Sequence, residues 1–397
     1  MDKYQKKVLL STSAGISLEN MDIMFLSFSL SSIIASFGIS SAQAGFISTI
    51  TNLGMLVGGI IFGILADKYG RVKIFSYTVI LFSLASALMF FAENIYLVYL
   101  FRFIAGIGAG GEYGACMSLI SETFSKKHLG KATSVAGIGA QVGAIMAAVL
   151  ASLIIPVLGW KMLYVIGVFP VILVLFIRKG LKEPKAFTEA AENESAGKFS
   201  LLFKDKKTSW QTVGLSLMVT VQIAGYFGLM NWLPSIMQKQ LGLTVSGSSL
   251  WMISTILGMS LGMFTFGTIM DKLGPRLSYT IFLIFSALSV FLIVLADSKW
   301  TLLAAAVIVG YFINGMYGGY GAIISRLYPT EIRSTANNFI MNVGRAIGGF
   351  SSVVIGFLMD RYTLMFVIIF LSIIYLFSLC ILYTMPSVAK LHQKDIL

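Results

Sequence analysis

Apolar runs of about 20 residues recur along the whole chain, with short polar gaps between them. A run of this length crosses the roughly 30 Å hydrocarbon core of a bilayer as an α-helix, which rises about 1.5 Å per residue. The pattern therefore predicts an all-α, polytopic membrane protein with 12 spans. The predicted spans are 8–36, 45–66, 74–93, 95–120, 132–155, 161–178, 209–237, 248–270, 277–296, 300–325, 334–359 and 363–385.

Composition supports this interpretation. The chain has 397 residues, of which 57% are hydrophobic and 12% charged, whereas roughly a quarter of the residues of a soluble domain are charged. A water-soluble globule is therefore excluded. The first run carries Glu19 and Asp22 and no small-residue cleavage site, so we expect a retained helix rather than a signal peptide.

The net charge of +12 follows from membrane topology. If both termini are cytoplasmic, 23 of the 29 Lys and Arg residues lie in cytoplasmic segments, 4 lie outside and 2 lie within spans. This asymmetry is the positive-inside rule. We therefore expect a multi-pass protein of the cell membrane with cytoplasmic termini and no nucleic-acid partner.

The residue types that support catalysis or metal binding are scarce. Both cysteines lie within spans, and both histidines lie in polar segments. No nucleophile–base pair and no metal-ligand cluster is evident, so we expect neither an enzyme nor a metal site. A transporter-like sensor is a further alternative, but the tail after about residue 386 is too short for a signalling domain.

The two halves of the chain repeat one another. The segment from Gly63 to Arg71 (GILADKYGR) recurs from Gly267 to Arg276 (GTIMDKLGPR), at an offset of 204 residues. The repeat predicts a six-helix bundle over 1–177, a cytoplasmic linker over 178–208, a second six-helix bundle over 209–386 and a short tail over 387–397. Parallel repeats of this kind place a substrate site between the halves and work by alternating access.

Three segments carry a family resemblance. They are GILADKYGRVK (63–73), RFIAGIGAGGEYG (102–114) and YPTEIR (328–333), and with them the chain resembles the major facilitator superfamily over nearly its whole length. The ENMD of the first span and the GGE of the fourth further resemble the metabolite:proton symporters. The resemblance implies a monomeric symporter that imports a small organic anion, such as a monocarboxylate or aromatic acid, with the proton as coupling ion and no cofactor.

Ionisable residues inside spans are the first functional candidates, because lipid tolerates them only where they face protein or water. Asp22 and Arg102 fall at similar depths, so we expect an ion pair. A carboxylate that leaves its arginine gains affinity for a proton, and the resemblance implies that such a pair couples protons to transport. Glu19, one turn before Asp22, and Glu112, in a glycine-rich run, are further proton-coupling candidates. The alternative for Asp22 and Arg102 is a static ion pair that holds the two helices together.

Arg345 is the predicted anchor of an anionic substrate, since its charged planar fork suits a carboxylate and it lies near mid-membrane. A pair between Arg345 and a buried acid is the alternative. The other candidates for substrate contact are polar or aromatic residues within spans, namely Asn342, Gln141, Tyr226, Asn231, Trp232, Tyr311, Asn314 and Tyr317.

A latch on the cytoplasmic side is the third expectation. The resemblance implies that Asp67, at the end of the second span, meets the free N–H groups at the start of the eleventh helix. Arg71, Glu122 and Arg333 are expected to complete a switching charge cluster, and Asp271 occupies the repeated position of Asp67.

Two other kinds of transporter fit the same fold. One is a proton-coupled exporter of drugs or metabolites, whose fifth span typically carries a Gly-Pro motif that GIGAQVG (137–143) lacks. The other is a symporter of a neutral or zwitterionic solute such as a sugar or a betaine.

Overall fold

The computed structural model describes residues 1–169, 171–172, 181–193, 195–241 and 245–396. Over these residues all regular structure is helical, which confirms the predicted fold class. The α-helices are α1 (Lys3–Phe37), α2 (Ser41–Tyr69), α3 (Arg71–Leu88), α4 (Ile95–Thr123), α5 (Leu129–Leu158), α6 (Trp160–Val165), α8 (Lys185–Ala191), α9 (Lys206–Leu241), α10 (Val245–Leu273), α11 (Pro275–Ser289), α12 (Leu292–Leu295), α13 (Lys299–Gly315), α14 (Tyr317–Leu327), α15 (Arg333–Gly348), α16 (Ser351–Arg361), α17 (Leu364–Tyr383) and α18 (Pro386–Ile396). Short 3-10 segments are η1 (Met89–Phe91), η2 (Lys126–His128), η3 (Ile166–Val168), η4 (Phe199–Phe203) and η5 (Thr330–Ile332).

Within the described part of the chain, nine helical segments are long and apolar enough to cross a membrane. The other three predicted spans correspond to α6 with η3, to α9, and to α15 with α16. Several predicted spans are interrupted rather than continuous. The span predicted over 300–325 breaks at Met316, between α13 and α14, and that over 334–359 breaks after Gly348. Glycines flank both breaks, and glycine is among the weakest helix formers.

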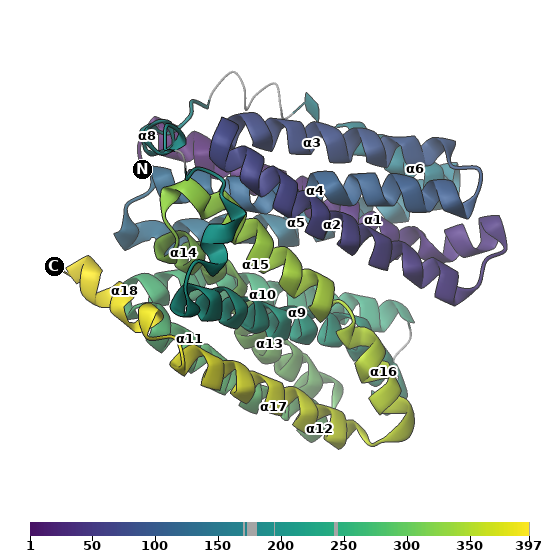
Figure 1. The fold of residues 1–397 in the computed structure, drawn as a ribbon. Helices are drawn as coiled ribbons and strands as arrows, with labels where there is room; N and C mark the ends of the chain where they lie inside the picture. The colour runs from purple at the N-terminus through teal and green to yellow at the C-terminus, as the bar shows by residue number, and fades with distance from the viewer. Residues whose placement is uncertain (170, 173–180, 194, 242–244, 397) are drawn as a thin grey trace. The chain divides into compact units, whose positions relative to one another are not determined.

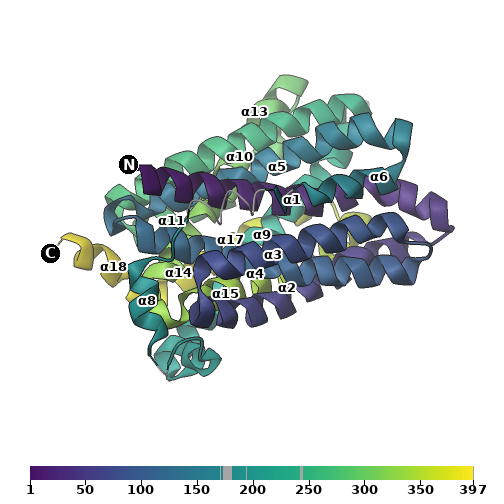
Figure 2. The same ribbon diagram turned by 90° about the horizontal axis from the view of Figure 1, so that it is seen from above.

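The chain forms two compact units, and the first consists of Met1–Ser125, Val135–Lys204 and Ile324–Asn342. In it α4 packs along both α2 and α3, as Figures 1 and 2 show. Glycines allow this approach, because a β-carbon at Gly58 would overlap the carbonyl of Ile107 and one at Gly110 would overlap that of Met55. Small residues at helix contacts are the usual means of close packing in membranes. The packing role expected for the glycines of α4 is therefore present.

The second unit consists of Lys126–Ser134, Asp205–Ile323 and Val343–Leu397. Its α10 packs along α13, and α11 packs against α17 (Figure 1). A β-carbon at Gly262 would overlap the carbonyl of Tyr311. Gly262 is the repeat counterpart of Gly58 at the offset of 204 residues. The sequence repeat is thus matched by a repeat in helix packing.

Each unit includes a short segment from the other half of the sequence. Residues 324–342, which hold the end of α14 and most of α15, pack in the first unit, and residues 126–134, at the start of α5, pack in the second. The predicted boundaries of the two bundles and the linker stay predictions. Both borrowed segments carry contacts of the candidate latches.

Candidate functional site

Asp22 and Arg102 form a buried ion pair within the first unit. Asp22 lies on α1 and is 3% exposed, and Arg102 lies on α4 and is 1% exposed. The Nη2 of Arg102 is 2.8 Å from the Oδ2 of Asp22, and its Nη1 is 3.4 Å from Oδ1. A guanidinium opposite a carboxylate in this two-point geometry forms strong charge-assisted hydrogen bonds. The expected pair is present, and its role in proton coupling stays a prediction.

Two further residues touch this pair and were not expected from the sequence. The hydroxyl of Ser86, on α3, donates to Oδ1 of Asp22. The guanidinium of Arg102 lies 5.6 Å from the ring centroid of Tyr164, on α6. The Tyr164 hydroxyl is 2.9 Å from the Ser29 hydroxyl of α1. Residues of three helices, α3, α4 and α6, therefore lie near the Asp22 carboxylate of α1.

Glu19 and Glu112 lie on the same two helices as the ion pair. Glu19 is 2% exposed and Glu112 is fully buried. A β-carbon at Gly15 of α1 would overlap a carboxylate oxygen of Glu112, so that carboxylate lies against α1 one turn before Glu19. Three buried acidic side chains and one arginine thus lie on α1 and α4, and the roles of Glu19 and Glu112 in proton coupling stay predictions.

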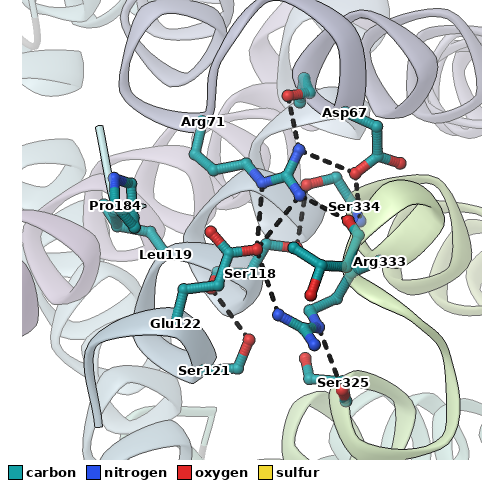
Figure 3. A network of polar contacts seen from close by, with 12 residues as sticks. Asp67, Arg71, Ser118, Leu119, Ser121, Glu122, Pro184, Ser325, Arg333 and Ser334 are labelled. Carbon is teal, nitrogen blue, oxygen red and sulfur yellow. Dashed lines mark hydrogen bonds and ion pairs between the residues drawn. The ribbon is translucent and has the colours of Figure 1, made fainter. Parts of the chain in front are cut away.

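The Asp67 latch, shown in Figure 3, joins α2 to the start of α15 within the first unit. The Oδ1 of Asp67 accepts from the backbone N–H of Ser334 at 3.0 Å. Its Oδ2 accepts from the backbone N–H and the hydroxyl of Thr335 at 2.8 and 2.6 Å. Ser334 and Thr335 lie in the first turn of α15, whose N–H groups have no intrahelical partner. The contact that the resemblance implied is present, with its gating role still a prediction.

Arg71, Glu122 and Arg333 extend this latch into a charge-balanced cluster (Figure 3). Arg71 Nη1 is 2.9 Å from Asp67 Oδ1, and Glu122 Oε1 lies 3.1 Å from both Arg71 Nη2 and Arg333 Nη1. Arg71 also donates to the backbone carbonyl of Thr330 at 2.7 Å. Burial lowers the pKa of the Arg333 guanidinium from its usual range, and the adjacent Glu122 carboxylate opposes that shift. Two acids and two arginines thus neutralise one another where α2, α3, α4 and α15 meet.

The linker contributes to the same cluster through Glu183, which sequence reasoning missed. Its carboxylate accepts from the backbone N–H groups of Arg71, Val72 and Lys73, in the first turn of α3, at 2.8 to 3.1 Å. The Phe187 ring of α8 lies 4.9 Å from the Arg71 guanidinium. Gly70 adopts a φ of 122°, which favours glycine, and a β-carbon there would collide with the Glu183 carboxylate. This part of the linker is therefore docked rather than freely solvated.

Asn342, whose contact with substrate stays a prediction, bonds to the backbone of α4. Its Nδ2 donates to the carbonyl of Gly110 at 2.7 Å, and Nδ2 of Asn338 donates to the carbonyl of Gly111 at 3.1 Å. Ser334 donates to the Ser118 hydroxyl at 2.9 Å. Residues 334, 338 and 342 follow one another at helical spacing on one face of α15. That face is held against α4 by side-chain hydrogen bonds.

Asp271 makes the corresponding latch within the second unit. Its Oδ1 accepts from the backbone N–H of Gly130 at 2.8 Å and its Oδ2 from that of Lys131 at 2.9 Å. These donors lie in the first turn of α5. A β-carbon at Gly130 would lie 2.7 Å from the Asp271 carboxylate. Both aspartates of the repeat therefore cap a helix that begins in the other half of the sequence.

The remaining substrate candidates are distributed over both units. In the second unit, Arg345 Nη2 donates to the Tyr317 hydroxyl at 3.2 Å, and the Gln222 amide lies 3.4 Å from Oδ1 of Asn314. Two further tyrosine candidates lie in the same unit. Tyr311 accepts a hydrogen bond from the Thr265 hydroxyl at 2.6 Å, and Tyr226 lies within electrostatic range of Tyr317.

Gln141, by contrast, lies on α5 in the first unit, where it is 5% exposed. The side chains of Asn231 and Trp232 lie outside the described residues. The structure brings Arg345, Tyr317 and Tyr226 together, and their contact with substrate stays a prediction.

Comparison with known proteins supplies relatives that span almost the whole chain. A protein of Haemophilus influenzae, named as a metabolite transport protein with no metabolite specified, is 37% identical over 96% of this chain and 95% of its own length. The cis,cis-muconate transport protein of Acinetobacter baylyi is 31% identical over 87% of this chain and 85% of its own. The benzoate transport protein of the same species is 24% identical, covering 90% and 84%.

A solved structure confirms the fold. The proton:xylose symporter XylE superimposes with a TM-score of 0.80 over 96% of this chain and 95% of its own, at 14% identity. The family model of the Major Facilitator Superfamily matches residues 12–349 and 215–395. These matches agree with the helical architecture, and the relatives are transporters that match the metabolite:proton symporter branch. The chain therefore belongs to the Major Facilitator Superfamily of membrane transporters.

Proposed function

We propose that this transporter is a symporter that couples the inward movement of protons to the import of a small organic acid anion. The proton is its coupling ion, and no other cofactor takes part. The buried Asp22–Arg102 pair carries the proposal, because a membrane-embedded carboxylate facing a single arginine can exchange its partner for a proton. The protein works in the cell membrane by alternating access.

The coupling follows from electrostatics. While the pair at 2.8 Å is closed, Arg102 stabilises the Asp22 carboxylate. If the two helices move apart, Asp22 keeps a low-dielectric environment but loses its counter-charge, and protonation becomes favourable. A conformational change that separates α1 from α4 is thereby tied to the uptake of one proton. Because linkage is reciprocal, release of the proton from Asp22 in turn favours closure of the Asp22–Arg102 pair.

The substrate class follows from Arg345. Its guanidinium is always charged, and a hydroxyl, that of Tyr317, lies 3.2 Å away. A carboxylate can bind both groups at once, with two hydrogen bonds from the arginine and one from the tyrosine. Relatives named as transporters of cis,cis-muconate and benzoate support an organic acid as the substrate. We therefore assign Arg345 the role of anchor for the substrate carboxylate.

Reconstituted vesicles test the function directly. Purified protein in proteoliposomes is given an inward proton gradient, acidic outside, and uptake of radiolabelled benzoate and cis,cis-muconate is followed. We expect uphill accumulation of one or both acids that stops when a protonophore collapses the gradient. Both acids are weakly acidic, so protein-free vesicles under the same gradient provide the correction for passive entry of the neutral form.

Two results would contradict the proposal. Accumulation equal to that of the protein-free vesicles for both acids would remove the assigned substrate class. Uptake that is protein-dependent but insensitive to the protonophore, or export from preloaded vesicles under the same gradient, would remove proton symport. D-Xylose serves as a neutral probe, and its accumulation in place of the acids would assign the site to uncharged solutes.

A further inference from the structure

We infer that Ser86 of α3 is a positioning residue that sets the proton affinity of Asp22 and thereby the pH range in which the transporter works. The inference rests on the proposed proton coupling through Asp22 and deepens it. Ser86 lies outside the two helices that carry the ion pair. It therefore makes a third helix, α3, part of the coupling device.

The position of Ser86 is fixed on both sides. Its hydroxyl donates to Oδ1 of Asp22, and the residue is fully buried. On its other side, η3 presents Gly167, where a β-carbon would lie 3.1 Å from both the Cβ and the Oγ of Ser86. A side chain at 167 would require Ser86 to shift by a few tenths of an ångström. Gly167 thus leaves room for Ser86 in the position from which its hydroxyl donates to Asp22.

The groups that face the Asp22 carboxylate come from four elements. Arg102 of α4 contacts both oxygens, Ser86 of α3 contacts Oδ1, and Tyr164 of α6 lies within electrostatic range of both charged partners. Glu19 lies one turn earlier on α1 itself. Of these, Ser86 is the uncharged hydrogen-bond donor to the carboxylate. It favours the ionised form without adding charge to the site.

Ser86 matters most when Arg102 is away. In the closed pair the arginine dominates, because charge-assisted bonds are roughly twice as strong as neutral ones. If the pair opens by a swing of the Arg102 side chain, the hydroxyl donor on α3 stays in contact with the carboxylate and keeps its proton affinity from rising too far. Without that donor, Asp22 would hold its proton too tightly to release it at the inner face.

The test measures proton-driven uptake in proteoliposomes as a function of external pH. For S86A we expect the pH of half-maximal uptake to move upward by about one unit, which is about tenfold in proton affinity. The maximal rate should fall as proton release slows, while the KM for the organic acid changes little. A purely structural role would reduce the amount of active protein and leave the pH profile in place.

Ser83 provides a matched control on the same helix. It lies one turn earlier, is also fully buried, and its hydroxyl has no hydrogen-bond partner among the described residues. S83A removes the same atom from the same helix and should leave the pH profile unchanged. An unshifted profile in S86A, or equal shifts in S86A and S83A, would overturn the inference.

A double variant separates this inference from the function on which it rests. In the D22N background, substrate exchange should be insensitive to S86A, because the carboxylate that the hydroxyl serves is gone. An S86A effect of equal size in both backgrounds would assign Ser86 to packing. If D22N itself keeps full proton-driven accumulation, the proposed coupling fails. If D22N loses accumulation and the S86A profile does not move, only the role of Ser86 fails.

Discussion

At the residue scale, Arg102 and Ser86 contact the buried Asp22 carboxylate. Asp22 and Arg102 could be paired from sequence, because depth along two predicted helices is a matter of residue count. Ser86 could not be found in this way. A helical serine usually bonds the carbonyl four residues earlier, as Ser76 on the same helix bonds Val72. Only the rotation of α3 about its axis decides that Ser86 instead meets a carboxylate.

Arg345 offers a residue-scale test of the substrate class. R345K keeps the charge but loses the planar fork, so at least one charge-assisted hydrogen bond to the substrate carboxylate is lost. Such a bond is worth about 1.5–3 kcal/mol, so we expect KM for the transported acid to rise roughly tenfold or more with the coupling intact.

The matched control for this prediction is R361K, the same change at an exposed arginine of α16. Uptake kinetics in proteoliposomes provide the measurement. An R345K variant with an unchanged KM would place the anchor elsewhere.

At the scale of elements, each candidate latch is a contact between an aspartate and the N-terminus of a helix. The first turns of α15 and α5 each present free N–H groups to an aspartate from the other half of the sequence. The sequence repeat predicted both aspartates, because they recur at one offset. It did not predict Glu183, since a polar stretch between two bundles has the composition of a solvated linker. It also did not predict the break at Met316, where hydropathy is continuous.

The Asp67 latch makes a prediction about accessibility. D67N replaces an acceptor oxygen with an NH2 group that opposes the donors of α15, so the start of that helix should separate from α4 more often. Ser118 lies buried beneath this contact and is a suitable reporter. We expect S118C, in a C116S/C380S background, to react with a water-soluble maleimide several-fold faster when D67N is added.

D297N is the control for this labelling, because it makes the same substitution at an exposed aspartate that takes no part in the latch. Equal labelling rates with and without D67N would show that Asp67 does not hold the start of α15 in place.

The Asp271 latch should act on its own helix. In D271N one of the two N–H groups of Gly130 and Lys131 loses its acceptor oxygen and faces an NH2 group, so amide hydrogen exchange in a peptide covering 126–134 should accelerate. Exchange in the peptide covering 331–338, which belongs to the Asp67 latch, should stay at the wild-type rate. Hydrogen exchange followed by mass spectrometry gives both values from one sample. Acceleration confined to 331–338 would contradict the assignment of Asp271 to α5.

At the scale of the whole molecule, the repeat could be predicted from sequence, and the family resemblance implied the contact of 324–342 with Asp67, whereas the placement of 126–134 was not expected. The offset of 204 residues recurs in the latch aspartates and in the helix-packing glycines Gly58 and Gly262. Hydropathy and repeats describe each half separately, however, so they give no sign that 324–342 packs with the first half and 126–134 with the second. Both borrowed segments contact aspartates through backbone N–H groups. Every residue type except proline carries such a group, so the amino-acid composition does not reveal these contacts.

The central claim is that the Asp22 carboxylate couples protons to substrate movement. The most direct measurement compares D22N with wild type in the same proteoliposomes by two assays, accumulation driven by a proton gradient and exchange of substrate without a gradient. We predict that D22N loses accumulation and keeps a substantial part of exchange, because D22N removes the proposed proton acceptor and leaves Arg345, the proposed substrate anchor, unchanged. Full accumulation by D22N would contradict the account.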